Sequence, residues 1–182
     1  MTCLSLSSNM IDNDGAYEIS SLLKKNTTIS EIYLEANRFR EEGLLQITES
    51  LKDKKNFSAI SFKNEIIITS YIAHNLISFL GQSTNLKKLS LSFSYINQEY
   101  EKIMNVLKDH KNLKSLELYI YEKSYNISAI TSLIENNTVL TSLSIQGQLV
   151  TSTPFGFNAP IELEECILRN TTLTSLNMQT GE

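Results

Sequence analysis

Apolar residues recur along this chain in a fixed six-residue pattern, L-x-x-L-x-L, in which other large apolar side chains can replace leucine. Seven copies begin near residues 1, 29, 57, 86, 113, 140 and 173, so the repeat is 27 to 29 residues long except for a last step of 33. Their central positions are Leu4, Ile32, Ile60, Leu89, Leu116, Leu143 and Leu176. Seven copies in near-constant phase predict a repeat architecture.

Each copy fits one short strand with one buried face. Side chains alternate along a strand, so the apolar fourth and sixth positions point to the same side. The third, fifth and seventh positions point the other way and are nearly all polar. We expect these positions, Ser61 and Ser92 among them, to form one solvated face. Its larger members are Glu31, Tyr33, Glu35, Lys63, Lys88, Glu117 and Tyr119.

The second half of each repeat has the spacing of an amphipathic helix, as in Ile19, Leu22 and Leu23. Acidic residues gather where these helices start and lysines where they end, which suits the helix dipole. Alternating strands and helices imply parallel strands. Helices are wider than strands, about 10 Å against about 4.8 Å, so the stack must curve. We expect residues 1–182 to form a single α/β domain, a horseshoe-shaped solenoid of about seven strands and six helices, with the parallel sheet on the concave face and the helices on the convex face.

The repeat unit resembles that of the ribonuclease-inhibitor-like leucine-rich-repeat family. The first repeat matches the pattern L-x-x-L-x-L-x-x-N-x-I-x-x-x-G, and an N-T-T-I junction follows its helix. In that family the ninth-position asparagine ties adjacent turns together. Only Asn9 and Asn37 keep it here, and the next equivalents are Glu65 and Ser94, so the resemblance implies less regular turns there. The family includes inhibitors, immune receptors, a Ran GTPase-activating protein, actin-capping proteins and bacterial effectors. It therefore implies a fold rather than one function.

Composition narrows the function classes. The net charge of −4 argues against a general nucleic-acid binder. The sequence contains neither an apolar stretch long enough to span a membrane nor the pattern of a signal peptide, so we expect a cytoplasmic protein. Delivery into another cell is compatible with the same sequence. Cys3 and Cys166 fall in the first strand and the sixth helix, too far apart to pair, which fits a reducing compartment.

Candidate chemistry is sparse. His74 and His110 lie about one repeat apart with no cysteine nearby, and no histidine joins the serines of the solvated face. We therefore expect no metal site, no cofactor and no enzymatic activity.

The N-x-[ST] sequons are expected to be turns of the repeat rather than glycosylation sites. A stripe of lysines precedes the middle strands and consists of Lys52, Lys54, Lys55, Lys87, Lys88, Lys111 and Lys114. It either binds anions or simply suits the helix ends.

Arg38 and Arg40 follow the second strand, beside Glu41 and Glu42. Two interpretations stay open. The resemblance to the Ran activator implies an electrostatic contribution to a GTPase partner. The alternative is a pair of solvated turn residues that form ion pairs with the adjacent acids.

Aromatic residues gather where strands four and five end and in the longer loop after strand six. Aromatic side chains are enriched in binding hot spots, and loops on a rigid scaffold often carry binding residues. Alternatively, Tyr121 and one phenylalanine turn inward and fill the core. The candidate partner-binding residues are Tyr119, Glu117, Phe93, Tyr95, Tyr121, Lys88, Phe155, Phe157 and Tyr33.

The sequence therefore favours a non-catalytic, effector-like module that binds an unknown protein. The binding surface would be the concave face and the edge formed by the turns that follow the strands, which we call the ascending-turn edge. A regulator of a small GTPase and a structural fragment of a larger receptor or scaffold are the alternatives. No capping element is visible at either end, so we expect the chain to be part of something longer or to self-associate through its terminal strands.

Overall fold

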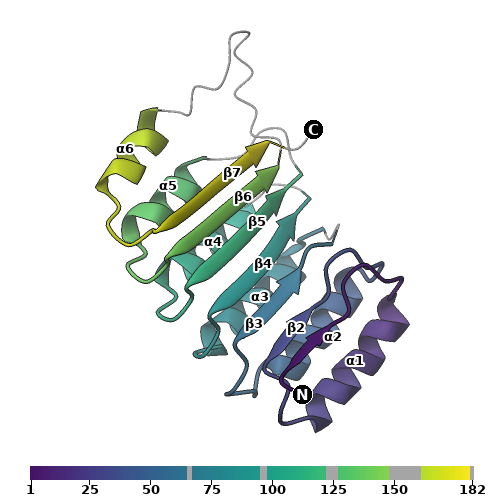
Figure 1. The fold of residues 1–182 in the computed structure, drawn as a ribbon. Coiled ribbons are helices and arrows are strands. Elements are labelled where there is room, and N and C mark those ends of the chain that lie inside the picture. The colour runs from purple at the N-terminus through teal and green to yellow at the C-terminus, as the bar shows by residue number, and fades with distance from the viewer. Residues whose placement is uncertain (65–66, 95–97, 122–126, 148–160, 181–182) are drawn as a thin grey trace.

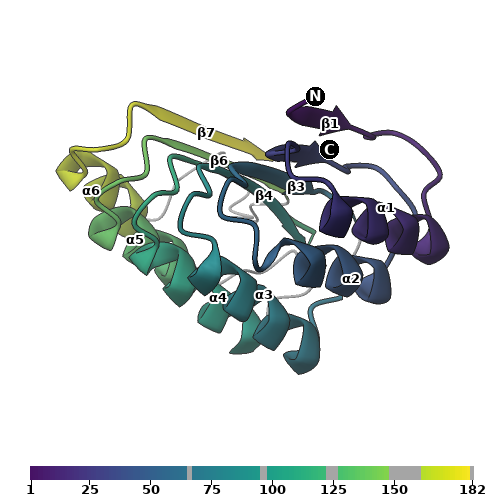
Figure 2. The same ribbon diagram turned by 90° about the horizontal axis from the view of Figure 1, so that it is seen from below.

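Strands and helices alternate along the whole described chain. A computed structural model describes residues 1–64, 67–94, 98–121, 127–147 and 161–180 (Figure 1). Its elements are β1 (Cys3–Ser5), α1 (Asn13–Lys25), β2 (Glu31–Tyr33), α2 (Glu41–Leu51), β3 (Ala59–Phe62), α3 (Ser70–Gln82), β4 (Lys88–Phe93), α4 (Gln98–Asp109), β5 (Ser115–Ile120), α5 (Ile127–Asn136), β6 (Ser142–Gly147), α6 (Ile161–Arg169) and β7 (Ser175–Thr180). The strands form one parallel sheet in chain order, and the helices cover one face of it (Figure 2). This is the predicted leucine-rich-repeat solenoid.

The strand register follows the phase of the repeats. Leu4 pairs with Ile32, and the column of central apolar residues continues in register to Leu176 in β7. From β2 to β6 the members of this column are at most 2% exposed, whereas Leu4 and Leu176 at the two edges are only partly buried. Each repeat thus completes the core of its neighbours, which is why one unit alone is insufficient.

The charge pattern expected at the helix ends is only partly present, since α3 and α5 have neither an acid in the first turn nor a basic residue in the last turn. Asp12 caps α1 by accepting a hydrogen bond from the Gly15 N–H at 3.0 Å. Acids occupy the first turns of α1, α2, α4 and α6, and lysines the last turns of α1 and α4. In contrast, α2 has no basic residue in its last turn, because Lys52 is its C-cap. The dipole pattern is therefore present but incomplete.

Asn13 and Gly43 join the first two helices closely. The Asn13 side-chain oxygen accepts the backbone N–H groups of Arg40 and Gly43, at 2.9 and 3.2 Å, so α1 caps the start of α2. A Cβ atom on Gly43 would lie 2.7 Å from Cβ of Phe39 and 2.9 Å from Cβ of Ala16. Only glycine allows the two helices to approach this closely.

The asparagine ladder of the ascending turns extends further than the family pattern implies. Asn37 donates to the Leu34 carbonyl at 2.9 Å, and its own N–H is accepted by the Asn64 side chain at 2.8 Å. Asn64 donates in turn to the Leu34 carbonyl at 3.3 Å, and its N–H is accepted by the Ser92 hydroxyl at 3.2 Å. The ladder residue of the third repeat is therefore Asn64 rather than Glu65, which lies outside the described residues.

The concave face is less uniformly solvated than expected. Ala59 and Ser61 are each 1% exposed and Ser92 is 3% exposed, so the prediction that these positions face solvent is wrong for them. All four residues of β3 are buried. The reason is side-chain length, because Ser61 is in register with the much larger Tyr33 on the adjacent strand.

Candidate partner-binding surface

Tyr119 is the centre of a polar cluster on the concave face. Its hydroxyl donates to Glu117 at 3.3 Å, and the same carboxylate oxygen accepts the Ser90 hydroxyl at 3.0 Å. The ammonium group of Lys63 lies 3.9 Å from the centre of the Tyr119 ring. Burial, reinforced by the nearby Glu117 carboxylate, raises the pKa of Tyr119 to about 12. The phenol is therefore a neutral donor at physiological pH, held in place but still partly exposed.

Ser92 explains how Lys63 and Tyr119 meet across two strand steps. Tyr119 is in register with Ser92 on β4, and Lys63 directly follows β3. The Ser92 hydroxyl is bonded to the carbonyl groups of Phe62 and Asn64, so this short side chain stays close to the sheet. The two longer side chains therefore extend over it. The repeat pattern predicts Lys63 on this face but not its contact with Tyr119.

A second tyrosine–glutamate pair lies on β2. The Tyr33 hydroxyl donates to Glu31 at 3.1 Å, and burial together with this bond raises the pKa of Tyr33 to about 12. Tyr33 is half-buried. Because β3 and β4 lie between β2 and β5, the structure leaves Tyr33 and Tyr119 on separate parts of the face.

Phe93 does not belong to this surface. Its side chain is 0% exposed, and its ring meets that of Tyr100 edge-on with centroids 5.0 Å apart. Phe93 is the last residue of β4 and turns inward, so the expectation that it contacts a partner is corrected. Tyr121, in contrast, is 47% exposed rather than in the core. One phenylalanine therefore fills the core as the alternative interpretation expects, and Tyr121 does not.

The other candidates divide into described and undescribed residues. Lys88 is exposed at the start of β4, and Glu117 is half-buried beside Tyr119. Tyr95, Phe155 and Phe157 lie outside the described residues.

Arg38 and Arg40 are exposed on the ascending turn before α2. The expected ion pairs with Glu41 and Glu42 do not form. Glu41 accepts the Ile67 N–H at 3.1 Å, and Glu42 accepts the Asn13 amide at 3.1 Å. The interpretation of these arginines as residues paired with the adjacent acids is therefore wrong.

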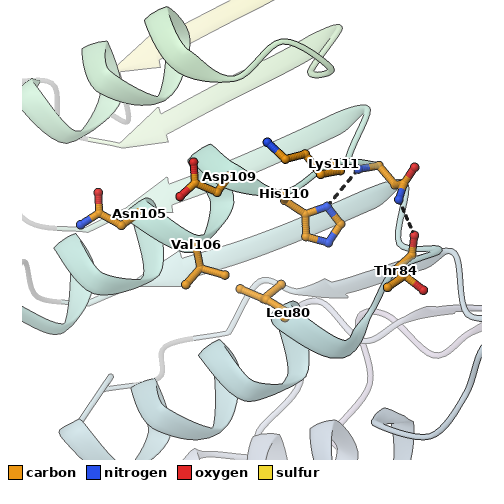
Figure 3. A pocket seen from close by; sticks show the side chains of 9 residues that line it. Leu80, Thr84, Asn105, Val106, Asp109, His110 and Lys111 are labelled. Carbon is orange, nitrogen blue, oxygen red and sulfur yellow. Dashed lines mark hydrogen bonds between the residues drawn. The ribbon is translucent and has the colours of Figure 1, made fainter.

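His110 is a structural residue of the turn before β5, at the edge of a cavity of about 400 Å³ (Figure 3). Its Nδ1 atom accepts the N–H groups of Asn112 and Leu113, at 3.3 and 3.1 Å. Burial lowers the pKa of His110, although a backbone bond to Ser83 opposes the shift. Asn137 makes the corresponding bonds one repeat later. His110 thus imitates a turn asparagine.

The same bonds explain the N-T-T junctions. Asn26 accepts the N–H groups of Thr28 and Ile29, and Asn170 accepts those of Thr172 and Leu173, all between 2.7 and 2.9 Å. Both asparagines therefore close turns, as the repeat interpretation of the sequons predicts.

Some lysines of the stripe also have local partners. Lys52 pairs with Glu49, and Lys54 donates to the Asn26 carbonyl.

The described residues also bear on metal sites, disulfides and membrane spans. No group of three or more histidine, cysteine or acidic side chains there is placed to hold a metal ion. Cys3 and Cys166 are both free thiols, as their separation predicts, and burial raises the pKa of Cys166. No helix in the described ranges combines the length and the apolar character that a bilayer crossing requires.

The proteins of known sequence or structure that resemble this chain are distant from it in sequence. No family model matches the chain. Over 90 residues it is 29% identical to leiomodin-2 of Gallus gallus, a match that covers 49% of this chain and 16% of that relative's length. A structure named Leiomodin-1 Actin-Binding Site 2 is 16% identical over 93% of this chain and 80% of its own, with a TM-score of 0.43. An internalin (inlF) from Listeria monocytogenes is 16% identical over 100% of this chain and 62% of its own, with a TM-score of 0.36. The fold assignment rests instead on this chain's own strand order and register.

Proposed function

We propose that this protein is a non-catalytic interaction module that binds a protein partner on its concave face and ascending-turn edge, with Tyr119 as the central contact. The observation that carries the proposal is the fixed geometry of that side chain. Its ring lies against Lys63 and its hydroxyl is bonded to Glu117, yet it is only half-buried. Tyrosine is enriched in binding hot spots, and a side chain already held in one conformation loses little entropy on binding.

The surroundings of Tyr119 suit a protein surface. The half-buried side chains of Ser115, Ser142 and Ser144 lie on β5 and β6 of the same face. They are short and polar, so they leave room for a partner and contribute little binding energy themselves. Lys88 adds an exposed positive charge on β4.

We also propose the ribonuclease-inhibitor-like subtype for these repeats. Repeats of 27 to 29 residues, helices of 9 to 13 residues on the convex side and a ladder of turn asparagines support it. GTPase regulation and a role as a structural fragment stay alternatives. A captured partner that is a small GTPase would favour the first. Monomeric actin is one arm of the test, since the leiomodin-1 structure is named for an actin-binding site.

The test is capture of partners from a cell lysate on the immobilised chain, identification by mass spectrometry, and hydrogen exchange on the purified complex. We expect protection of residues 115–120 and of the neighbouring concave strands. In a titration, Tyr119→Ala should weaken binding by more than about 1 kcal/mol. Ser175→Ala, on the exposed edge strand β7, is the matched control and should be near neutral. Protection confined to the convex helices would refute the proposal.

A further inference from the structure

The ascending-turn edge contains a cavity that shares Lys63 with the concave tyrosine cluster but extends away from Tyr119. It has a volume of about 820 Å³, and its lining residues include Arg38, Arg40, Lys63 and Tyr121. Arg38 and Arg40 belong to the second repeat and Tyr121 to the fifth. The cavity thus joins two features that are far apart in the sequence, and we call it the rim cavity.

The rim cavity is positively charged in an acidic protein. Its lining residues within the described ranges include three cations, Arg38, Arg40 and Lys63, and one carboxylate, Glu35, so the formal charge of these four is +2, whereas the chain carries −4. Glu35 already accepts the Ser7 hydroxyl. A concentration of one sign of charge in a concave place favours a ligand of the opposite sign.

The two arginine side chains are available for such a ligand. Both are exposed, and neither forms an ion pair within the part of the chain that the structure describes. Their backbones, in contrast, are fixed. The Arg38 N–H donates to the Ile11 carbonyl at 2.8 Å, and the Arg40 N–H donates to Asn13 at 2.9 Å. Arg40 is also the N-cap residue of α2 but makes no capping bond with its side chain. The turn therefore holds two guanidinium groups that have no ion-pair partner among the described residues, on a hydrogen-bonded backbone.

The kind of anion follows from the donors that remain. The backbone N–H groups of Ala36, Asn37, Arg38 and Arg40 all donate within the solenoid, so these four cannot cradle a phosphate. The remaining donors are two planar guanidinium groups, which can each bind a carboxylate, as they can a phosphate, through two parallel hydrogen bonds. Without the backbone cradle that commonly holds a phosphate, we favour the carboxylate. The exposed Tyr121 ring at the same cavity can pack against the stem of an extended peptide.

We propose that the rim cavity binds an acidic segment of a protein partner, whose glutamate or aspartate carboxylates pair with Arg38 and Arg40. This inference rests on the proposed function and deepens it. The Tyr119 cluster supplies the central contact, and the rim cavity selects partners by charge.

A fluorescein-labelled poly-glutamate peptide, followed by fluorescence anisotropy at fixed ionic strength, tests the rim cavity. We expect Arg38→Ala/Arg40→Ala to weaken binding about tenfold or more, because two charged hydrogen-bond partners are lost. Lys24→Ala/Lys25→Ala removes the same charge from the exposed end of α1 and should change the affinity by less than about twofold. All four side chains are exposed, so circular dichroism should show both variants folded.

Three results would overturn the inference. They are undetectable binding of the peptide to the parent, equal losses in the two double variants, and displacement of the peptide by inorganic phosphate at matched ionic strength. The captured partner separates this inference from the proposed function. If the partner binds Arg38→Ala/Arg40→Ala with normal affinity but no longer binds Tyr119→Ala, the concave site is supported and the rim cavity is refuted. If the peptide binds in a way that depends on the arginines but no partner binds the concave face, the rim cavity is supported and the concave site is refuted.

Discussion

The ammonium group of Lys63 lies 3.9 Å from the centre of the Tyr119 ring, although β4 lies between β3, which Lys63 follows, and β5, which contains Tyr119. The contact requires a short residue between them, and Ser92 supplies it. A cation over an aromatic face contributes about 0.5–1 kcal/mol at exposed sites and about 2 kcal/mol when desolvated.

The first prediction is that Lys63 and Tyr119 are energetically coupled. In a double-mutant cycle with Lys63→Met and Tyr119→Leu, the coupling free energy of unfolding should be about 0.5–1 kcal/mol. Chemical denaturation of the parent and the three variants measures it. Additive effects within error would show that the contact contributes nothing to stability.

The second prediction concerns the two faces of the sheet. Leu116→Ala should cost about 2–5 kcal/mol, because Leu116 is 0% exposed and belongs to the central apolar column. Ser115→Ala on the other face should change the free energy of unfolding by less than about 0.5 kcal/mol, since Ser115 is half-exposed. Urea unfolding compares them, and equal losses would contradict the assignment of the faces.

The third prediction concerns the ladder. Asn64→Ala should destabilise the protein by about 1–3 kcal/mol, because it leaves the partly buried N–H of Asn37 without its acceptor. Asn9→Ala is the matched control, and its cost should be smaller because Asn9 is exposed and bonds only within its own turn. A larger effect at Asn9 than at Asn64 would reverse this assignment.

The fourth prediction is a pH dependence that His110 causes. Burial lowers the folded-state pKa of His110 below its ordinary value of 6.5, so the unfolded chain binds the proton first as the pH falls. Its contribution to stability is complete above about pH 6.5 and decreases below it, by at most about 1.4 kcal/mol per pH unit, until the folded-state pKa is reached.

Unfolding at a series of pH values from neutral to acidic measures this dependence. His110→Asn is the control, since asparagine provides the same acceptor in the turns at Asn26, Asn137 and Asn170 but does not titrate. The variant should have a flatter profile than the parent. Parallel profiles for the two proteins would assign the pH dependence to other groups.

The fifth prediction is self-association. Within the described residues, β1 and β7 each pair with one strand, so each presents a row of unpaired backbone groups. On concentration, this chain should form dimers or larger species through these edges, as light scattering would show. Lysine in place of Ser5 or Asn177 on the exposed strands should reduce the association, and a monomer at every concentration would count against it.

The fold was predictable because its signal is a buried pattern that recurs in phase. Leu89 and Leu116 are both core residues because each holds the central position of its repeat. The burial of one therefore predicts the burial of the other. The site was less predictable, because it depends on how far side chains extend across neighbouring strands. The inward turn of Phe93 and the burial of Ser92 are of this kind.

Some missed details did have a signal in the sequence. His110 lies three residues before the first leucine of its repeat, where Asn26, Asn137 and Asn170 stand in other repeats. Alignment of the repeats would therefore have identified a turn acceptor. Asn64 required one further step, because it lies four residues after the central Ile60, whereas Asn37 lies five residues after Ile32.

The ladder of turn asparagines also constrains how such a chain can change its length over time. The Asn37 N–H finds its acceptor in Asn64, and the Asn64 N–H finds its acceptor in Ser92. Excision of one whole repeat removes one such N–H group together with one such acceptor, so the N–H group of the repeat before the excision meets the acceptor of the repeat after it. A cut of any other length leaves an amide opposite no partner. Duplication or loss of whole repeats by recombination is therefore the genetic event that this architecture accepts most readily.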